Sequence, residues 1–160
     1  MAAGRQLFPK HSMCFQKWKR RFFSGLGGPE RPNYAAYEDS VQAIIESGQA
    51  VLINGGGGEF MDGFFFRPTP GHSPDHLSIS LSSQGENALF AGDIIHLPIQ
   101  IDYPELSSCF GADPERGRLS RLWALEYTVA NNALFFSSHC PGSSAGRVKR
   151  NSGQFQWCFV

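Results

Sequence analysis

The chain has 160 residues, of which 41% are hydrophobic and 18% are charged. This length and composition indicate a globular protein with one core of its own, and they exclude an intrinsically disordered chain. Basic and acidic residues balance to a formal net charge of zero, so no nucleic-acid or membrane partner is predicted. No apolar run reaches transmembrane length and no signal peptide is evident, so a soluble, cytoplasmic protein is expected.

The basic cluster at residues 17–21 and the cysteines both have structural interpretations. Aromatic residues interleave with the basic residues at helical spacing, which predicts the exposed face of a short helix instead of a nucleic-acid patch. The four cysteines are widely spaced and form no CxxC pair. Free thiols are therefore expected, and neither a zinc knuckle nor a redox pair is indicated.

The first half of the chain predicts a loop, a helix and short strands. Residues 24–33 are rich in Gly and Pro and predict a loop. Residues 37–47 predict a short helix, with Asp39 or Ser40 as its N-cap. The runs 49–53 and 63–67 are strand candidates, separated by a glycine turn.

The second half predicts a hairpin, a long helix and further strands. Residues 76–83 alternate Leu or Ile with Ser, and residues 88–91 return as a buried strand. Asp113 and Pro114 predict the start of the longest helix. Its expected buried stripe consists of Leu119, Leu122, Trp123, Val129 and Ala130. Apolar runs at 133–137 and 154–160 complete the pattern, which indicates an α/β protein of α+β layers with helices covering a sheet.

Three metal-type side chains follow strand-like runs. His72 lies in a Pro- and Gly-bracketed turn, Asp93 follows Gly92, and His139 ends an apolar run. Side chains at strand ends can meet at one edge of a sheet, and two imidazoles with a carboxylate suit a zinc-type hydrolytic centre. Taken singly, each has a structural alternative, because strand-end histidines are often surface residues and Gly-Asp is often a turn. A serine or cysteine nucleophile is disfavoured because no GxSxG elbow is present.

Three motifs around these residues resemble a known family. They are Thr69-Pro70-Gly71-His72-Ser73-Pro74-Asp75-His76, Phe90-Ala91-Gly92-Asp93-Ile94-Ile95-His96 and Ser138-His139-Cys140-Pro141-Gly142. Together they are similar to the C-terminal half of a metallo-β-lactamase-fold hydrolase, of the methyl-parathion-hydrolase-like and quorum-quenching-lactonase-like branch. The resemblance implies a partial αββα sandwich and a small-molecule ester-, lactone- or phosphotriester-type substrate whose identity stays open.

The resemblance also implies roles for four residues. His72 would be a ligand of the first metal and His139 of the second. Asp93 would bridge the two metals and act as the catalytic carboxylate. His76 would support the ligands without binding a metal, with a plain surface histidine as the alternative. The cofactor would be zinc, two divalent ions in the family, and Mn, Fe or Co also suit such ligands.

The chain departs from the family in one large respect. The HxHxDH signature that should precede these motifs is absent, and His11 is the single earlier histidine. Each metal would keep two protein ligands, whereas a catalytic zinc normally has three. We therefore expect an N-terminally truncated single domain over residues 1–160, weakly active or inactive as a hydrolase. The alternative is a non-catalytic pseudoenzyme or protein-interaction module, able to form a homo-oligomer through exposed sheet edges.

Overall fold

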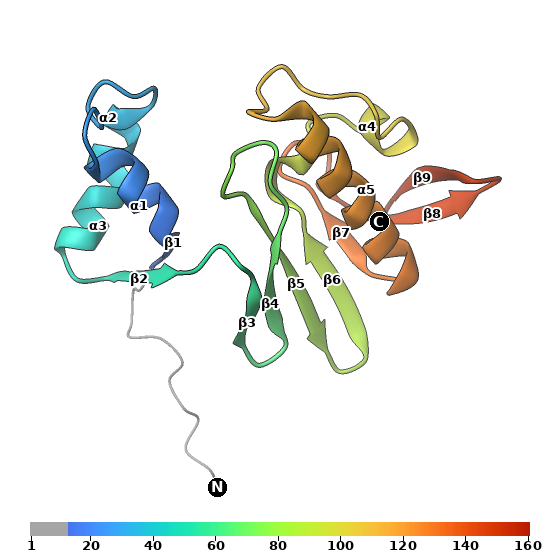
Figure 1. The fold of residues 1–160 in the computed structure, drawn as a ribbon. Coiled ribbons are helices and arrows are strands. Elements are labelled where there is room, and N and C mark those ends of the chain that lie inside the picture. Colours follow the sequence, from blue (N-terminus) through green and yellow to red (C-terminus); the bar gives the residue numbers. More distant parts are fainter. Residues whose placement is uncertain (1–12) are drawn as a thin grey trace, which may run out of the picture. The chain divides into compact units, whose positions relative to one another are not determined.

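The computed structural model describes residues 13–160, which divide between Gly55 and Gly56 into two compact units. Figure 1 shows the helices and strands of both units. His11 lies outside the described residues, and the expectation of a single domain over residues 1–160 stays a prediction. Within the described residues, no helix is long and apolar enough to cross a membrane.

The first unit consists of helices and a small parallel sheet. Its elements are β1 (Met13–Gln16), α1 (Lys17–Ser24), α2 (Tyr34–Ala36), η1 (Tyr37–Gln42), α3 (Ala43–Glu46) and β2 (Ala50–Ile53). Strand β1 pairs in parallel with β2. In α1, Phe23 is buried and stacks on Tyr37 with a ring-centroid distance of 4.7 Å, while most of the basic residues are exposed. The predicted helix with a basic outer face is confirmed.

The helix expected at 37–47 exists, but its start and its cap were wrong. The helical segment runs from Tyr34 to Glu46 through α2, η1 and α3. Asp39 and Ser40 lie inside η1, a stretch of π-helix, and they cap nothing. Asn33 precedes the segment in the left-handed conformation, with φ of 64°. A π-helical stretch has wider turns than the α-helical spacing on which the prediction relied.

The second unit is built on one seven-stranded sheet. Its elements are β3 (Gly58–Met61), β4 (Phe64–Pro68), β5 (Leu77–Ser83), β6 (Glu86–Phe90), η2 (Gly92–Ile94), α4 (Ile99–Asp102), α5 (Pro114–Ala130), β7 (Leu134–Phe136), β8 (Ala145–Asn151) and β9 (Gln154–Phe159). The strands lie in sequence order from β3 to β9. Every neighbouring pair is antiparallel except β6 and β7, which are parallel and are joined through α4 and α5. The mixed α/β fold class is confirmed.

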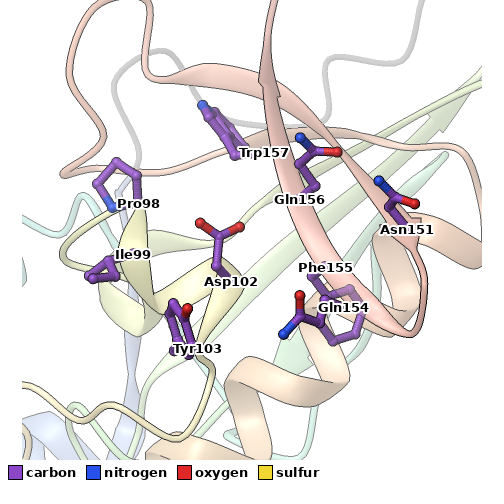
Figure 2. A pocket seen from close by; sticks show the side chains of 9 residues that line it. All are labelled: Pro98, Ile99, Asp102, Tyr103, Asn151, Gln154, Phe155, Gln156 and Trp157. Atoms are coloured by element: carbon purple, nitrogen blue, oxygen red, sulfur yellow. The ribbon is translucent and has the colours of Figure 1, made fainter.

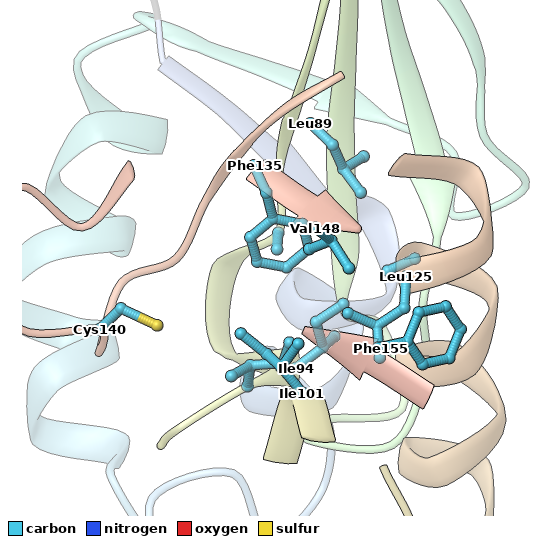
Figure 3. Packing of buried hydrophobic residues seen from close by; sticks show 11 residues of the cluster. Leu89, Ile94, Ile101, Leu125, Phe135, Cys140, Val148 and Phe155 are labelled. Carbon is cyan, nitrogen blue, oxygen red and sulfur yellow. The ribbon is translucent and has the colours of Figure 1, made fainter. Parts of the chain in front are cut away.

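Helix α5 packs against β6 and β8 and covers one face of this sheet (Figure 1). The core between them is formed by large apolar side chains, among them Leu89, Leu125, Phe135, Val148 and Phe155 (Figure 3). Such side chains each contribute about 1.5–3 kcal/mol when fully buried. Asp113 caps the helix as predicted, because its Oδ1 accepts a hydrogen bond from the Arg116 N–H at 3.0 Å.

The predicted buried stripe of α5 was partly wrong. Leu119 is 53% exposed and Trp123 is 37% exposed. The buried face instead carries Ser120, Arg121, Ala124, Leu125 and Thr128. Small and hydrogen-bonded side chains are tolerated there because backbone carbonyls satisfy them: Arg121 Nη1 donates to the Ile94 carbonyl at 2.9 Å.

The two faces of the sheet differ in what they bury. In β5, Ser78 and Ser80 are buried, whereas Leu77, Ile79 and Leu81 are half-buried. The strand register places further aromatic and aliphatic side chains in the same rows as these leucine and isoleucine residues: Phe64, Phe66, Phe90, Leu134 and Phe136. The sheet therefore has apolar side chains on both faces, which is the pattern of a sheet that forms a layer inside a sandwich.

Candidate functional site

His72, Asp93 and His139 lie together at one end of the sheet. His72 follows β4, Asp93 lies in η2 directly after β6, and His139 follows β7. Asp93 Oδ2 is 3.6 Å from His72 Nε2, and Asp93 Oδ1 is 3.1 Å from His139 Nε2. The two oxygens of one carboxylate thus face two different imidazoles. The proximity that the strand ends predicted is present, while the ligand roles stay predictions.

The loop that carries His72 is anchored on the start of α5. The Gly71 carbonyl accepts a hydrogen bond from the Asp113 N–H at 2.9 Å, and the His72 carbonyl accepts one from the Ala112 N–H at 3.1 Å. Gly71 has φ of 143°, and a Cβ placed on it would lie 2.2 Å from the Gly117 backbone. A side chain at position 71 would collide with α5, whereas a Cβ on Gly117 would meet Gly71 at an ordinary 3.8 Å. Gly71 is therefore the glycine that sets the position of the His72 loop.

His76 holds the backbone of Asp93. The Asp93 N–H donates to His76 Nε2 at 3.1 Å, which leaves Nδ1 to carry the proton of the ring. That Nδ1 lies 2.8 Å from Thr69 Oγ1 and 3.1 Å from the Thr69 carbonyl, where it donates. Burial, the largest influence, lowers the pKa of His76 and favours this neutral form. Both ring nitrogens of His76 thus have partners, and the ring fixes the backbone of Asp93 with neither nitrogen left free to bind a cation.

A buried chain of hydroxyls continues this arrangement into the sheet. Ser78 Oγ donates to the Ala91 carbonyl at 3.1 Å, and Thr69 Oγ1 lies 3.0 Å from Ser78 Oγ. Thr69 and Ser78 are both fully buried. Because every member has a partner, the network adds specificity to the ends of β4, β5 and β6 without leaving an unsatisfied polar group.

Gly92 is the position where this network meets the η2 turn. Its φ is 62°, and a Cβ placed on it would lie 2.7 Å from His76 Nε2. A side chain would be strained at this φ and would push against the imidazole that accepts from Asp93. Gly92 and Asp93 thus form a turn, which was the structural alternative for this pair. The same turn also directs the Asp93 carboxylate toward His72 and His139.

His96 belongs to the same cluster and was not assigned a role from the sequence. Its ring stacks on His139 with a centroid distance of 4.8 Å and lies 5.2 Å from the His72 ring. Burial is the largest cause that lowers its pKa, and His139 and His72 lower it further. The signal for finding it was its place three residues after Asp93, in the same motif.

The histidine cluster supplies only part of a metal site. In residues 13–160, no group of three or more His, Cys, Asp and Glu side chains is arranged to hold a metal ion. A cation on either side of Asp93 would meet one imidazole and one carboxylate oxygen, fewer than the three protein ligands of a catalytic zinc. His72 Nδ1 is also buried without a hydrogen-bond partner in this part of the chain, whereas metal-binding histidines usually donate that proton. The described residues alone therefore do not fit a complete two-metal site.

Comparisons with solved structures place the fold. The chain is similar to the hydrolase AbOPH in the beta lactamase superfamily, with a TM-score of 0.78 and 22% identity over 93% of this chain and 55% of that one. It is similar to AidC, a dizinc quorum-quenching lactonase, with a TM-score of 0.73 and 20% identity over 93% and 54%. It is similar to a mutant of B. thuringiensis AiiA with N-decanoyl-L-homoserine bound at the active site, with a TM-score of 0.59 and 20% identity over 80% of this chain and 46% of that one. The chain thus spans about half the length of these proteins.

A search of curated proteins found no match. The sequence model of the metallo-beta-lactamase superfamily matches residues 7–139, which is more than half of the chain. The large sheet with few helices agrees with a partial fold of this kind. On that match the chain belongs to the metallo-beta-lactamase superfamily.

Proposed function

We propose that the chain carries the C-terminal half of the active site of a metal-dependent hydrolase, which cleaves an ester, lactone or phosphotriester bond. The observation that supports it most is the Asp93 carboxylate, whose oxygens lie 3.6 Å and 3.1 Å from His72 Nε2 and His139 Nε2. That arrangement suits one carboxylate shared between two cations, zinc first, with Mn, Fe or Co also suited to these donors. Bound divalent ions would supply activation of water and stabilise developing negative charge.

The described residues have clear tasks in this proposal. Asp93 would hold both cation positions at a fixed spacing, and His72 and His139 would each complete one side. His76 would keep the Asp93 backbone in place through its 3.1 Å hydrogen bond without binding a cation. Two ligands on each side hold an ion weakly, and weak occupancy limits water activation. We therefore expect the 160-residue chain by itself to bind zinc weakly and to show little or no hydrolysis.

Zinc titration by calorimetry and hydrolysis assays test this proposal together. The probes are an N-acyl homoserine lactone, p-nitrophenyl acetate and a p-nitrophenyl phosphotriester. Weak zinc binding should disappear in Asp93→Ala and drop in His72→Ala, while the exposed hairpin variant Glu86→Gln should bind as the parent does. Zinc binding that survives Asp93→Ala would refute the assigned ligands. Tight stoichiometric zinc with hydrolysis lost in His72→Ala would refute the expectation of weak activity.

A second candidate is a non-catalytic interaction module. It is favoured by the two edges of the seven-stranded sheet, where β3 and β9 each pair with a single strand among the described residues. Such a module would use sheet edges to bind another chain or a second copy of itself. It predicts a protein that folds stably without zinc and whose affinity for its partner is unchanged in Asp93→Ala. Loss of partner binding in that variant would count against this candidate.

A further inference from the structure

Strand β9 is an edge strand whose own sequence carries no protection against pairing, although α4 packs beside part of it. It is the last strand of the seven-stranded order and pairs only with β8 in the described sheet, in a continuous register from Gly146↔Phe159 to Asn151↔Gln154. Its sequence, Gln-Phe-Gln-Trp-Cys-Phe, contains no charged residue and no proline. Native edges are normally blunted by charges, proline or bulges, because an open edge is a template for another strand.

The hairpin geometry fixes which backbone groups of β9 face outward. Ser152 and Gly153 form a two-residue turn with φ of 49° and 87°, values that fit a type I′ turn. The pair that closes such a turn is hydrogen-bonded, and hydrogen-bonded pairs then alternate along the ladder. Phe155 and Trp157, opposite Arg150 and Val148, therefore direct their N–H and C=O groups to the free edge. Among residues 13–160, no backbone hydrogen bond outside the helices and strands uses these groups.

A groove of about 580 Å³ runs beside this edge, between β9 and the segment that contains α4. We call it the β9 groove (Figure 2). Its lining residues are Pro98, Ile99, Asp102, Tyr103, Asn151, Gln154, Phe155, Gln156 and Trp157. Ile99 and Tyr103 leave 49% and 48% of their surface exposed. The volume lies within the usual range of ligand sites, about 300–1,000 Å³.

The chemistry of the β9 groove is one carboxylate among amides and aromatic rings. Figure 2 shows Asp102 at the centre of the lining, between Ile99 of α4 and the side chains of β9. No Lys or Arg lines the groove. Within residues 13–160, the Asp102 side chain makes no ion pair or hydrogen bond. Trp157 Nε1 is also buried without a partner in that part of the chain.

We propose that the β9 groove binds an extended peptide that adds a strand to β9 and sets a Lys or Arg side chain against Asp102. The free N–H and C=O groups of Phe155 and Trp157 would supply the backbone pairing. The lone carboxylate would select the basic side chain by charge complementarity. Ile99 and Tyr103 would cover the apolar side chains of the peptide on the α4 side.

A second copy of this chain fits the groove less well than a peptide. Edge-to-edge pairing of two β9 strands would bring two α4 segments, each with its unpaired Asp102, to the same interface. Like charges that face each other across an interface oppose association. A single extended segment needs only the width of one strand, and it brings a cation to a site that has none.

The proposal deepens the interaction-module candidate and is tested without zinc, so it can fail independently of the hydrolase proposal. A phage-displayed library of random short peptides is selected on the full 160-residue protein. Selected peptides should carry Lys or Arg. Their affinity, measured by fluorescence anisotropy, should drop about tenfold or more for Asp102→Lys. The control Glu105→Lys makes the same charge change at an exposed residue outside the groove and should bind as the parent does.

Hydrogen exchange of the complex supplies a second readout. The Phe155 and Trp157 amides should become protected, whereas the Gln156 amide, which already pairs with β8, should change little. A peptide N-methylated at alternate residues should lose binding. The proposal is overturned if no peptide is enriched, if Asp102→Lys binds the selected peptides as the parent does, or if protection appears away from β9. A concentration-dependent dimer that protects the same amides without peptide would instead assign the edge to a second copy.

Discussion

The backbone N–H of Asp93 donates to Nε2 of His76 at 3.1 Å, and this contact joins the turn after β6 to the start of β5. Asp93 therefore has two separate environments: its backbone is fixed from inside the sheet, and its carboxylate faces two histidines in the open. Variants can address the first environment without touching the second.

Replacing His76 with Phe should destabilise the second unit by about 1–3 kcal/mol, because the partly buried Asp93 N–H loses its acceptor while an aromatic ring is retained. Urea unfolding followed by tryptophan fluorescence measures the change. His139→Phe is the matched control, since the His139 side chain is 45% exposed. It should cost clearly less. Equal losses for the two variants would mean that His76 acts only as a space-filling ring.

The stability of the metal-free protein should fall as the pH drops through about 6.5. The pKa of His76 is lowered from 6.5 in the folded state, so the unfolded chain binds the proton more readily between the folded pKa and 6.5. This contribution is fully present above pH 6.5 and is lost as the pH falls toward the folded pKa. Urea midpoints are measured from about pH 8 to about pH 5, a range that brackets the ordinary titration of histidine at about 6.5. The midpoint should decline less steeply over this range in His76→Phe than in the parent. An identical decline in both proteins would contradict the assignment.

Gly92→Ala should destabilise more than Gly85→Ala, although both glycines have positive φ, 62° and 82°. An alanine in this conformation costs about 1–2 kcal/mol at either site. At Gly92 the new Cβ would also lie 2.7 Å from His76 Nε2, whereas at Gly85 it would meet nothing within 4 Å. The added crowding costs about 1–3 kcal/mol. Thermal or urea unfolding of the pair isolates that term, and equal losses would show that the imidazole moves aside freely.

Arg121→Met should destabilise the second unit by about 3 kcal/mol, because hydrogen bonds that involve a charged group are worth about 1.5–3 kcal/mol and two carbonyls lose their donor. Arg121 Nη1 donates to the Ile94 carbonyl at 2.9 Å, and Nε donates to the Pro104 carbonyl at 2.8 Å. The side chain is buried, at 3% exposure. Arg118→Met is the control and should leave the unfolding midpoint unchanged within error. Arg118 lies one turn earlier in α5 and, within the described part of the chain, pairs only with Glu115.

The sequence anticipated the proximity of His72, Asp93 and His139 for a physical reason. All three follow strands, and β4, β5, β6 and β7 are neighbours in the sheet, so the ends of β4, β6 and β7 meet at one place. His96 was missed because the chain leaves the sheet through η2, where no periodicity indicates direction. Whether these side chains bind a metal depends on ligands that strand periodicity cannot supply, so that part stays a prediction.

The packing of α5 and the existence of strand β8 could not be predicted from hydrophobic periodicity. Apolar periodicity assigned Trp123 to the core, but Arg121 is buried instead because carbonyls of the α4 region surround its guanidinium. Strand β8 was not predicted, since its Arg147, Lys149 and Arg150 leave no apolar run. Pairing with β7 and β9 on both sides holds it in the sheet. Both cases are decided by contacts between segments far apart in the chain.

The parallel pairing of β6 with β7 also dictates the order in which the cluster can assemble during folding. Phe90 pairs with Phe136 directly before the segments of Asp93 and His139, and α4 and α5 lie in the connection between them. Bringing the two ends of this long connection together costs conformational entropy, so the non-local parallel pairing of β6 with β7 is slow to form. The Asp93–His139 contact should therefore be among the last to appear in refolding and should report completion of the sheet, whereas the β5–β6 hairpin forms early.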